Sequence, residues 1–114
     1  MMNAKYQIDT AENRSFMKEM RKDLFEFGRN FPSPGGSAWY LTEDGQPWKE
    51  KNRESYCTSR MVHVYSIAHM MGVPGAKELA AEALKALKGE LNDKENGGWY
   101  TGLTEANEPM PLKL

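Results

Sequence analysis

Apolar positions recur at helical spacing over residues 10–28 of this 114-residue chain. Charged residues fill most of the positions between them, which is the pattern of an amphipathic helix. The apolar positions are Phe16, Met17, Met20, Leu24 and Phe27. Gly28 follows, and the stretch 31–36, rich in proline and glycine, does not continue a helix because its backbone angles are fixed or unusually permissive. The pattern therefore predicts a helix at about 10–28 that ends in a loop.

Two further helices are predicted at about 55–71 and 76–91. The first is apolar around most of its circumference, so it requires burial on nearly all sides. The second is amphipathic, because lysines and glutamates alternate with one apolar face. That face comprises Ala76, Leu79, Ala80, Leu84, Leu87 and Leu91. The short break at 72–75 predicts an antiparallel helical hairpin, with 55–71 as the inner member and 76–91 as the outer member.

Two short extended hairpins are predicted at about 37–48 and 97–110, and their sequences repeat. The segment 39–47, WYLTEDGQP, returns at 99–109 as WY, two inserted residues, and LTEANEP. The two Trp-Tyr pairs are 60 residues apart. A period made of a helical hairpin and an extended connection indicates a repeat architecture, in which neighbouring units bury each other's faces.

The chain holds fewer than two such units, which limits how far the helix at 55–71 can be covered. Five apolar side chains left half exposed would forfeit several kcal/mol, at about 25 cal/mol per Å² of apolar area. That loss is comparable with the whole stability of a small domain. We therefore expect residues 1–114 to form a single, incomplete unit. The alternative is a compact three-helix domain whose core is closed by Trp39, Trp48 and Trp99.

Composition and charge argue against several classes of partner. Fifteen Lys and Arg against sixteen Asp and Glu give a net charge of -1, with both signs scattered, so nucleic acid is not expected. No apolar run approaches the roughly 20 residues that span a bilayer, and residues 1–14 carry no secretory apolar segment, so no membrane partner is expected. The single Cys57 excludes an internal disulfide, and with two histidines it does not support a zinc cluster. These features predict a cytoplasmic protein without a metal.

Tyr56, Arg60 and His63 are the candidates for chemistry, because spacings of four and three place them on one face of a helix. A guanidinium on a largely apolar helix either meets a carboxylate of the same protein or reaches a cavity that holds a polar ligand. For His63 the structural interpretation, a core histidine bonded to a backbone carbonyl, is the stronger one. No glycine-rich phosphate loop is present, so no nucleotide cofactor is expected.

The order and spacing of three segments resemble the N-terminal region of the N-acylglucosamine 2-epimerase family, and within it the branch of mannose and sulfoquinovose isomerases. The segments are 58–66 (TSRMVHVYS), 71–76 (MGVPGA) and 93–100 (DKENGGWY). The resemblance implies the N-terminal part of an (α/α)6 barrel, an all-α fold of helical hairpins with short β-hairpin connections, whose inner helices line a sugar pocket.

The resemblance also implies a reaction. Members interconvert aldoses and ketoses or epimerise at C2, through an enediol intermediate, with two histidines as general acid and base and without a metal or other cofactor. Arg60 matches the arginine that contacts sugar oxygens, and Tyr56 stands where this branch often carries a pocket-facing tryptophan. Neither His63 nor His69 matches a catalytic histidine, so no catalytic residue is assigned in this chain.

Three functions remain open at the level of sequence. The leading hypothesis is an N-terminal fragment of a sugar aldose–ketose isomerase or 2-epimerase that binds a monosaccharide as part of the complete enzyme and is inactive alone. The second is a stand-alone helical module that associates with itself or a partner through the uncovered helix 55–71. The third is the start of an (α/α)6 glycoside hydrolase or lyase, in which paired carboxylates replace the histidines.

Overall fold

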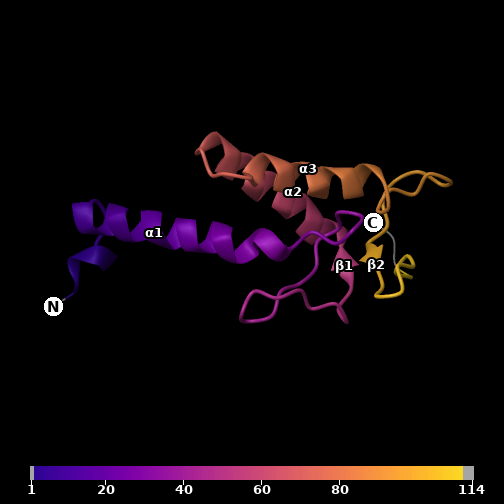
Figure 1. Ribbon diagram of the computed structural model, residues 1–114, viewed down its shortest axis with the longest axis horizontal. Helices are drawn as coiled ribbons and strands as arrows, with labels where there is room; N and C mark the ends of the chain where they lie inside the picture. Colours follow the sequence, from indigo (N-terminus) through magenta and orange to yellow (C-terminus); the bar gives the residue numbers. More distant parts are fainter. Residues whose placement is uncertain (1, 112–114) are drawn as a thin grey trace.

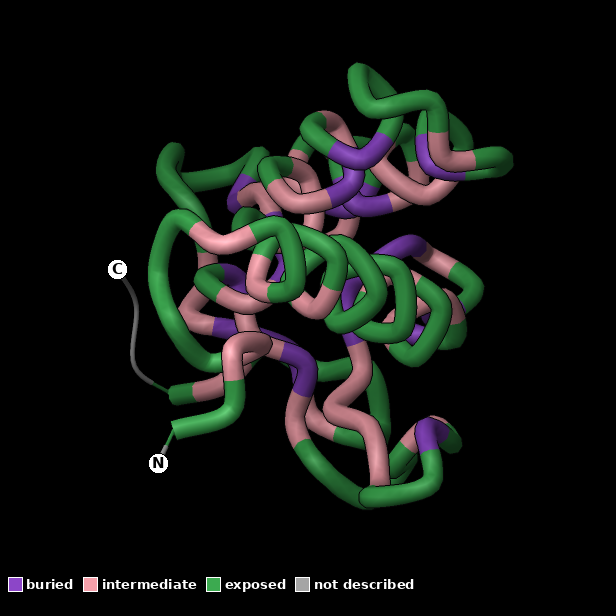
Figure 2. Tube along the Cα trace, turned by 90° about the vertical axis from the view of Figure 1, so that its left-hand side faces the viewer, coloured by how far each residue is buried: buried purple, intermediate pink, exposed green. Residues whose placement is uncertain are grey.

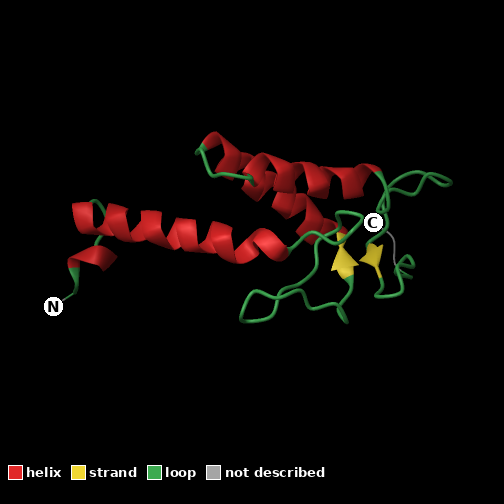
Figure 3. Ribbon diagram, viewed as in Figure 1, coloured by secondary structure: helices red, strands yellow, loops and turns green. Residues whose placement is uncertain are grey.

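The computed structural model describes residues 2–111, and helices dominate it (Figures 1 and 3). The helices are α1 (Ala11–Phe27), α2 (Ser55–Met70) and α3 (Ala76–Lys88), and two short 3-10 turns, η1 (Ala4–Tyr6) and η2 (Gly28–Asn30), flank α1. The strands β1 (Arg53–Glu54) and β2 (Gly102–Leu103) are two residues each and pair antiparallel. The molecule measures 57 × 26 × 22 Å, because α1 projects away from the other helices (Figure 1).

Helix α1 begins at a side-chain cap. The Thr10 hydroxyl accepts a hydrogen bond from the Asn13 amide at 3.0 Å, which satisfies one of the free amides of the first turn. None of the 17 residues of α1 is buried. Its contact with the remaining helices comes at its C-terminal end, where the Tyr65 hydroxyl donates to the Phe25 carbonyl at 2.8 Å. The Tyr65 ring also stacks on Phe31, with centroids 5.5 Å apart.

Helices α2 and α3 lie side by side as a hairpin (Figures 1 and 3). Ala68, Ala76 and Ala83 are fully buried between them, and such small side chains let two helices approach closely. The turn between the helices contains Gly72 at φ 83° and Gly75 at φ 78°, a backbone region that glycine enters without steric cost. The hairpin core therefore consists of alanines closed by larger neighbours, Phe31 and Tyr65.

The sequence repeat is also a structural repeat, because the two connecting loops fold alike. In the first loop the Thr42 amide donates to the Gln46 carbonyl at 2.8 Å, and the Thr42 hydroxyl accepts from the Gln46 amide at 3.1 Å. In the second loop Thr104 and Glu108 form the same two bonds, at 2.7 and 3.2 Å. Isolated bridges occupy matching places in the two loops: Pro32–Ala38 and Leu41–Pro47 in the first, Asn92–Trp99 and Leu103–Pro109 in the second.

The repeat makes α1 and α3 equivalent helices, since each is followed by the same loop. Residue Phe31, after α1, corresponds to Leu91, after α3, and both are buried. The Trp39 amide donates to the Phe31 carbonyl at 2.8 Å, and the Tyr100 amide donates to the Leu91 carbonyl at 3.0 Å. Helix α2 is then the one inner helix of the described chain, between two outer ones.

Three features differ from the expected pattern. The compact three-helix alternative is wrong, because Trp48 and Trp99 are 43% and 48% exposed and close no core. Buried stretches are short along the whole described chain (Figure 2). Leu84, expected to face inward, is 42% exposed. Helix α3 ends at Lys88, so Leu91 is buried from the following turn rather than from the helix.

Candidate functional site

Tyr56, Arg60 and His63 lie on one face of α2, as their spacing predicts, and all three are exposed in the described chain. The opposite face of α2 is buried and contains Ser55, Thr58, Tyr65 and Ala68. His63 is therefore not the core histidine that the structural interpretation expected. A row of polar and aromatic side chains, rather than an apolar surface, occupies the first half of the uncovered face.

The Arg60 guanidinium lies over the Tyr56 ring, with its central carbon 5.1 Å from the ring centroid. This is a cation–π contact between residues one turn apart, and it leaves the in-plane N–H donors of the guanidinium free to face other groups. Within residues 2–111 Arg60 forms no ion pair, so the carboxylate partner that the structural interpretation requires is not found in this part of the chain.

The Tyr56 hydroxyl lies 2.9 Å from the hydroxyl of Tyr40, which comes from the first loop. The Cys57 thiol is 3.7 Å from the same Tyr40 oxygen. The hydrogen bond to Tyr56, followed by partial burial, raises the pKa of the Tyr40 hydroxyl well above its ordinary value. Tyr40 therefore remains a neutral hydrogen-bonding group throughout the physiological pH range.

A groove of about 790 Å³ runs beside this row, between α2, α3 and the second loop. Tyr56 and Arg60 line one side, and Leu87 and Trp99 line the other. The Trp99 indole N–H donates to the Leu87 carbonyl at 2.7 Å, which fixes the indole at the groove wall. The exposed indole face beside the Arg60 guanidinium offers both stacking and hydrogen-bond donors to a polyol, whereas the Ser55 and Ser59 hydroxyls already donate to the carbonyls of Tyr100 and Ser55.

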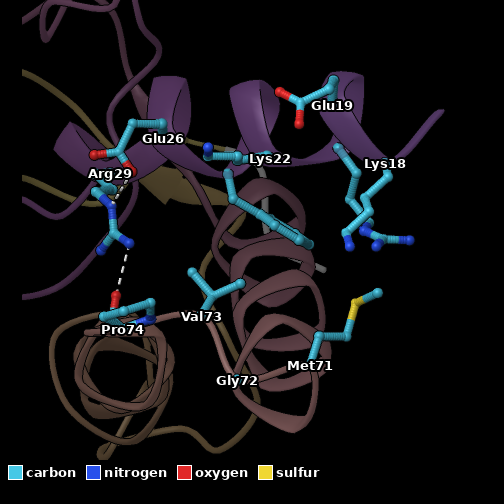
Figure 4. Close-up of a pocket in the computed structure, with 11 residues that line it drawn as sticks. Lys18, Glu19, Lys22, Glu26, Arg29, Met71, Gly72, Val73 and Pro74 are labelled. Atoms are coloured by element: carbon cyan, nitrogen blue, oxygen red, sulfur yellow. Dashed lines mark hydrogen bonds and ion pairs between the residues drawn. The ribbon is translucent and has the colours of Figure 1, made fainter. Parts of the chain in front are cut away.

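A second cavity, of about 510 Å³, lies between α1 and the turn 71–74 (Figure 4). Lys18, Lys22 and Arg29 line it together with Glu19 and Glu26. The Arg29 side chain is already engaged, since its Nε meets Glu26 at 2.8 Å and its Nη2 donates to the Pro74 carbonyl at 2.6 Å (Figure 4). This cavity is the space between α1 and the hairpin, bridged by Arg29, and it contains no candidate residue.

Arg53 is an organising residue that the sequence analysis missed. It is 6% exposed, and its guanidinium donates to the hydroxyls of Ser33 and Ser37 at 3.2 and 3.0 Å. On its other side it donates to the Thr104 carbonyl at 3.2 Å and to the side chain of Asn107 at 2.5 Å. Arg53 thus joins the two repeated loops, one carrying Trp39 and the other carrying Trp99.

Glu90, just after α3, completes this cluster. Its carboxylate lies 3.7 Å from Arg53 and accepts from the Ser37 amide at 3.1 Å and from the Ser37 hydroxyl. The partners come from positions far apart along the chain, so neither periodicity nor a local motif could reveal them. The sequence feature that could have pointed to this cluster is an arginine just before an inner helix, with serines in the preceding loop.

Residues 2–111 contain no cluster of three or more His, Cys, Asp or Glu side chains that could hold a metal ion. None of their helices is both long enough and apolar enough to cross a membrane.

Comparison with known proteins assigns the family. Residues 35–112, more than half of the chain, match the model of the N-acylglucosamine 2-epimerase (GlcNAc 2-epimerase) family. The chain belongs to this family. The matched region includes α2, α3 and both repeated loops up to residue 112, and it begins after α1.

Two relatives of the epimerase family are described as D-mannose isomerases. The protein from Thermobifida fusca is 37% identical over 94 residues, which is 82% of this chain and 23% of that protein. The protein from Pseudomonas cannabina pv. alisalensis is 42% identical over 48 residues, which is 42% of this chain and 12% of that protein. The chain therefore spans about a quarter or less of the length of these relatives.

The fold has a solved counterpart. The cellobiose 2-epimerase of Spirochaeta thermophila superposes with a TM-score of 0.64 and 19% sequence identity, over 89% of this chain and 28% of that one. This likeness confirms the predicted fold class, an all-α chain that forms part of an (α/α)6 barrel.

Proposed function

We propose that this chain supplies a monosaccharide-binding face of an aldose–ketose isomerase or 2-epimerase, and that it does not catalyse the reaction alone. The observation that carries the proposal is the free Arg60 guanidinium, stacked on Tyr56 beside a groove with an exposed indole. Membership of the epimerase family supports the reaction class, and the D-mannose isomerases among the relatives make D-mannose the first sugar to test.

The proposed chemistry passes through an enediol. A base removes the proton from C2 of the aldose, and the negative charge moves onto the oxygen at C1 as the enediolate forms. Moving the O2 proton to O1 and returning a proton to C1 gives the ketose, while re-forming the C1 carbonyl with the proton returned to the opposite face of C2 gives the epimer. A guanidinium with free in-plane donors stabilises the developing oxyanion, and such electrostatic stabilisation lowers the barrier without proton transfer by Arg60 itself.

The acid–base pair is the part of this chemistry that we do not assign to the chain. His63 and His69 both lie on α2 and are exposed. They are six positions apart, which is roughly 9 Å along the helix axis and roughly 120° around it. Two groups so placed do not act on the same pair of sugar carbons, which supports the proposal that the chain is inactive alone.

A titration of the isotope-labelled chain with D-mannose, followed by NMR, tests the binding face. We expect weak binding, with a Kd on the order of millimolar, because a single face of a pocket makes few contacts. Signals of Arg60, Tyr56 and Trp99 should shift together. Arg60→Ala should weaken binding by about 10- to 100-fold, which is the usual contribution of a hydrogen bond to a charged group.

Arg14→Ala is the matched control, since Arg14 is an exposed arginine on α1, outside the groove. It should leave the affinity unchanged. Equal losses in both variants, or mannose-induced shifts confined to α1, would contradict the proposed site.

Self-association is a second candidate function, favoured by the far half of α2. Here Ile67 and Met70 are exposed, as is Met71 directly after the helix, and Met70 reaches 78%. Apolar side chains of this size on one helix face are typical of a surface covered by another protein segment. Sedimentation at increasing protein concentration tests it: a concentration-dependent mass abolished by Met70→Lys supports the module, and a monomer at all concentrations removes it.

A further inference from the structure

The contact between Tyr40 and Tyr56 connects the first repeated loop to the proposed sugar-binding face. The two hydroxyl oxygens are 2.9 Å apart, within hydrogen-bond distance, and either can donate. Tyr56 in turn lies under the Arg60 guanidinium. Tyr40, Tyr56 and Arg60 therefore form a continuous row from a loop to a helix, which we call the tyrosine–arginine row.

Tyr40 is the fixed end of this row. Its carbonyl accepts from the Trp48 amide at 2.8 Å, and the next residue, Leu41, bridges to Pro47. Two residues earlier, the Ala38 amide donates to the Thr58 hydroxyl at 3.0 Å, where both residues are buried. The backbone around Tyr40 is thus held on both sides and anchored to α2.

Tyr56 and Arg60, by contrast, are exposed side chains with few constraints of their own. Within residues 2–111 the hydrogen-bond partner of the Tyr56 hydroxyl is Tyr40, and the side-chain partner of Arg60 is the Tyr56 ring. A long exposed arginine samples many rotamers unless a neighbour restricts it, and each restricted side chain lowers the entropy lost on binding.

We propose that Tyr40 is a positioning residue for the sugar site: its hydroxyl fixes the Tyr56 ring, and the ring holds Arg60 with its N–H donors directed toward a monosaccharide. This inference rests on the proposed function, since it assigns Arg60 to sugar oxygens. The class of ligand is an aldose or ketose with oxygens on adjacent carbons, which two neighbouring N–H donors of one guanidinium can contact together.

Tyr40→Phe tests the role, because it keeps the ring and removes only the hydroxyl. The first readout needs no sugar: the Arg60 guanidinium lies over the Tyr56 ring, so its N–H protons should have ring-shifted NMR signals, and the Nε–H signal also reports its order. In Tyr40→Phe both should move toward the values of a free arginine. Tyr6→Phe, on an exposed residue of η1, is the control and should change neither signal.

The second readout is affinity for D-mannose. Tyr40→Phe should weaken binding by about three- to tenfold, the usual worth of one neutral hydrogen bond. Tyr56→Phe, which removes the other hydroxyl, should weaken it by a similar factor. The double variant should be no weaker than either single one, because both substitutions remove the same contact.

Each outcome decides the inference. Unchanged Arg60 signals in Tyr40→Phe would overturn it, as would additive losses in the double variant. Shifted Arg60 signals in both Tyr40→Phe and Tyr56→Phe would support it, and the second variant also decides the matter if the first fails to fold. If mannose does not shift the Arg60 signals of the wild-type chain, the proposed function is wrong. The spectra recorded without sugar would still show whether Tyr40 positions Arg60.

Discussion

Arg53 is a charged residue whose role is structural. It is buried, it bridges the two repeated loops, and its carboxylate partner Glu90 is itself largely covered, with 18% of its side chain exposed. Removing one member of such a buried pair leaves the other charge without compensation, which costs more than the pair contributes. The loops that carry Trp39 and Trp99 therefore depend on a residue that does not face the groove.

Arg53→Met should destabilise the chain by about 3 kcal/mol or more, because Glu90 would stay buried without its cation. Urea unfolding followed by circular dichroism measures the change. Lys85→Met is the control, since Lys85 pairs with Glu82 at 2.8 Å on the exposed surface of α3, where such a pair contributes at most about 1 kcal/mol. Equal midpoints for the two variants would show that the Arg53 cluster is not structural.

Gly36 shows a different constraint at the same scale. Its φ is 96°, and a Cβ added there would lie 2.0 Å from the backbone carbonyl oxygen of Glu82 in α3. Gly72 has a similar φ of 83°, but a Cβ there would meet nothing within 4 Å. The two glycines share the backbone conformation and differ in the space around them.

Gly72→Ala should cost about 1–2 kcal/mol, the penalty of the left-handed conformation alone. Gly36→Ala should cost clearly more, because the first loop must also move away from α3. Thermal unfolding of the two variants compares the costs directly. If both variants melt at the same temperature, the close approach of the first loop to α3 is wrong.

At the scale of elements, α1 is attached to the hairpin through few side chains. Tyr65, Phe31 and Arg29 make the contacts, all near the C-terminal end of the helix. The N-terminal half of α1 packs on η1 through Tyr6 and Phe16, whose ring centroids are 5.4 Å apart. An element with so little buried surface opens at low free energy.

Amide hydrogen exchange should therefore be faster in residues 11–20 than in α2 and α3. Tyr65→Phe should extend fast exchange to the end of α1 and lower the free energy of unfolding by about 1 kcal/mol, because the Phe25 carbonyl loses its hydrogen bond from the Tyr65 hydroxyl. Tyr100→Phe, in the second loop, should leave α1 unchanged. Uniform protection across all three helices would contradict this view of α1.

The elements also show what sequence patterns can and cannot predict. Helical periodicity places α1, α2 and α3 within a few residues, because each has a regular apolar spacing and a glycine near its end. The end of α3 is overestimated, since Leu91 continues the apolar period although Gly89 ends the helix. The sequence analysis missed the pairing of β1 with β2, because strands of two residues are too short to show an alternation of apolar and polar positions.

The arrangement of the candidate site residues could be predicted in part, while their role in binding stays a proposal. Tyr56 and Arg60 lie on one helical face, so their spacing is enough to bring them together, and the stacked contact agrees with it. Tyr40 comes from a loop 16 residues earlier, and its approach to Tyr56 depends on how that loop folds back on α2. Tertiary contacts of this kind, like those of Arg53, have no local signature.

At the scale of the whole molecule, the chain is an outer helix, an inner helix and a second outer helix, joined by two copies of one loop. One face of the inner helix is buried within the chain, and the other presents the tyrosine–arginine row. We propose that this face binds a monosaccharide and that residues 2–111 do not place an acid–base pair to transfer its proton.

The most direct test is incubation of the purified chain with D-mannose in deuterated buffer, followed by NMR of the sugar. We expect mannose-dependent shifts of Arg60 in the protein spectrum, with no loss of the C2 proton of mannose and no fructose. Loss of the C2 proton that disappears in Arg60→Ala but persists in Arg14→Ala would contradict the account, because it would show that the chain completes the proton transfer by itself.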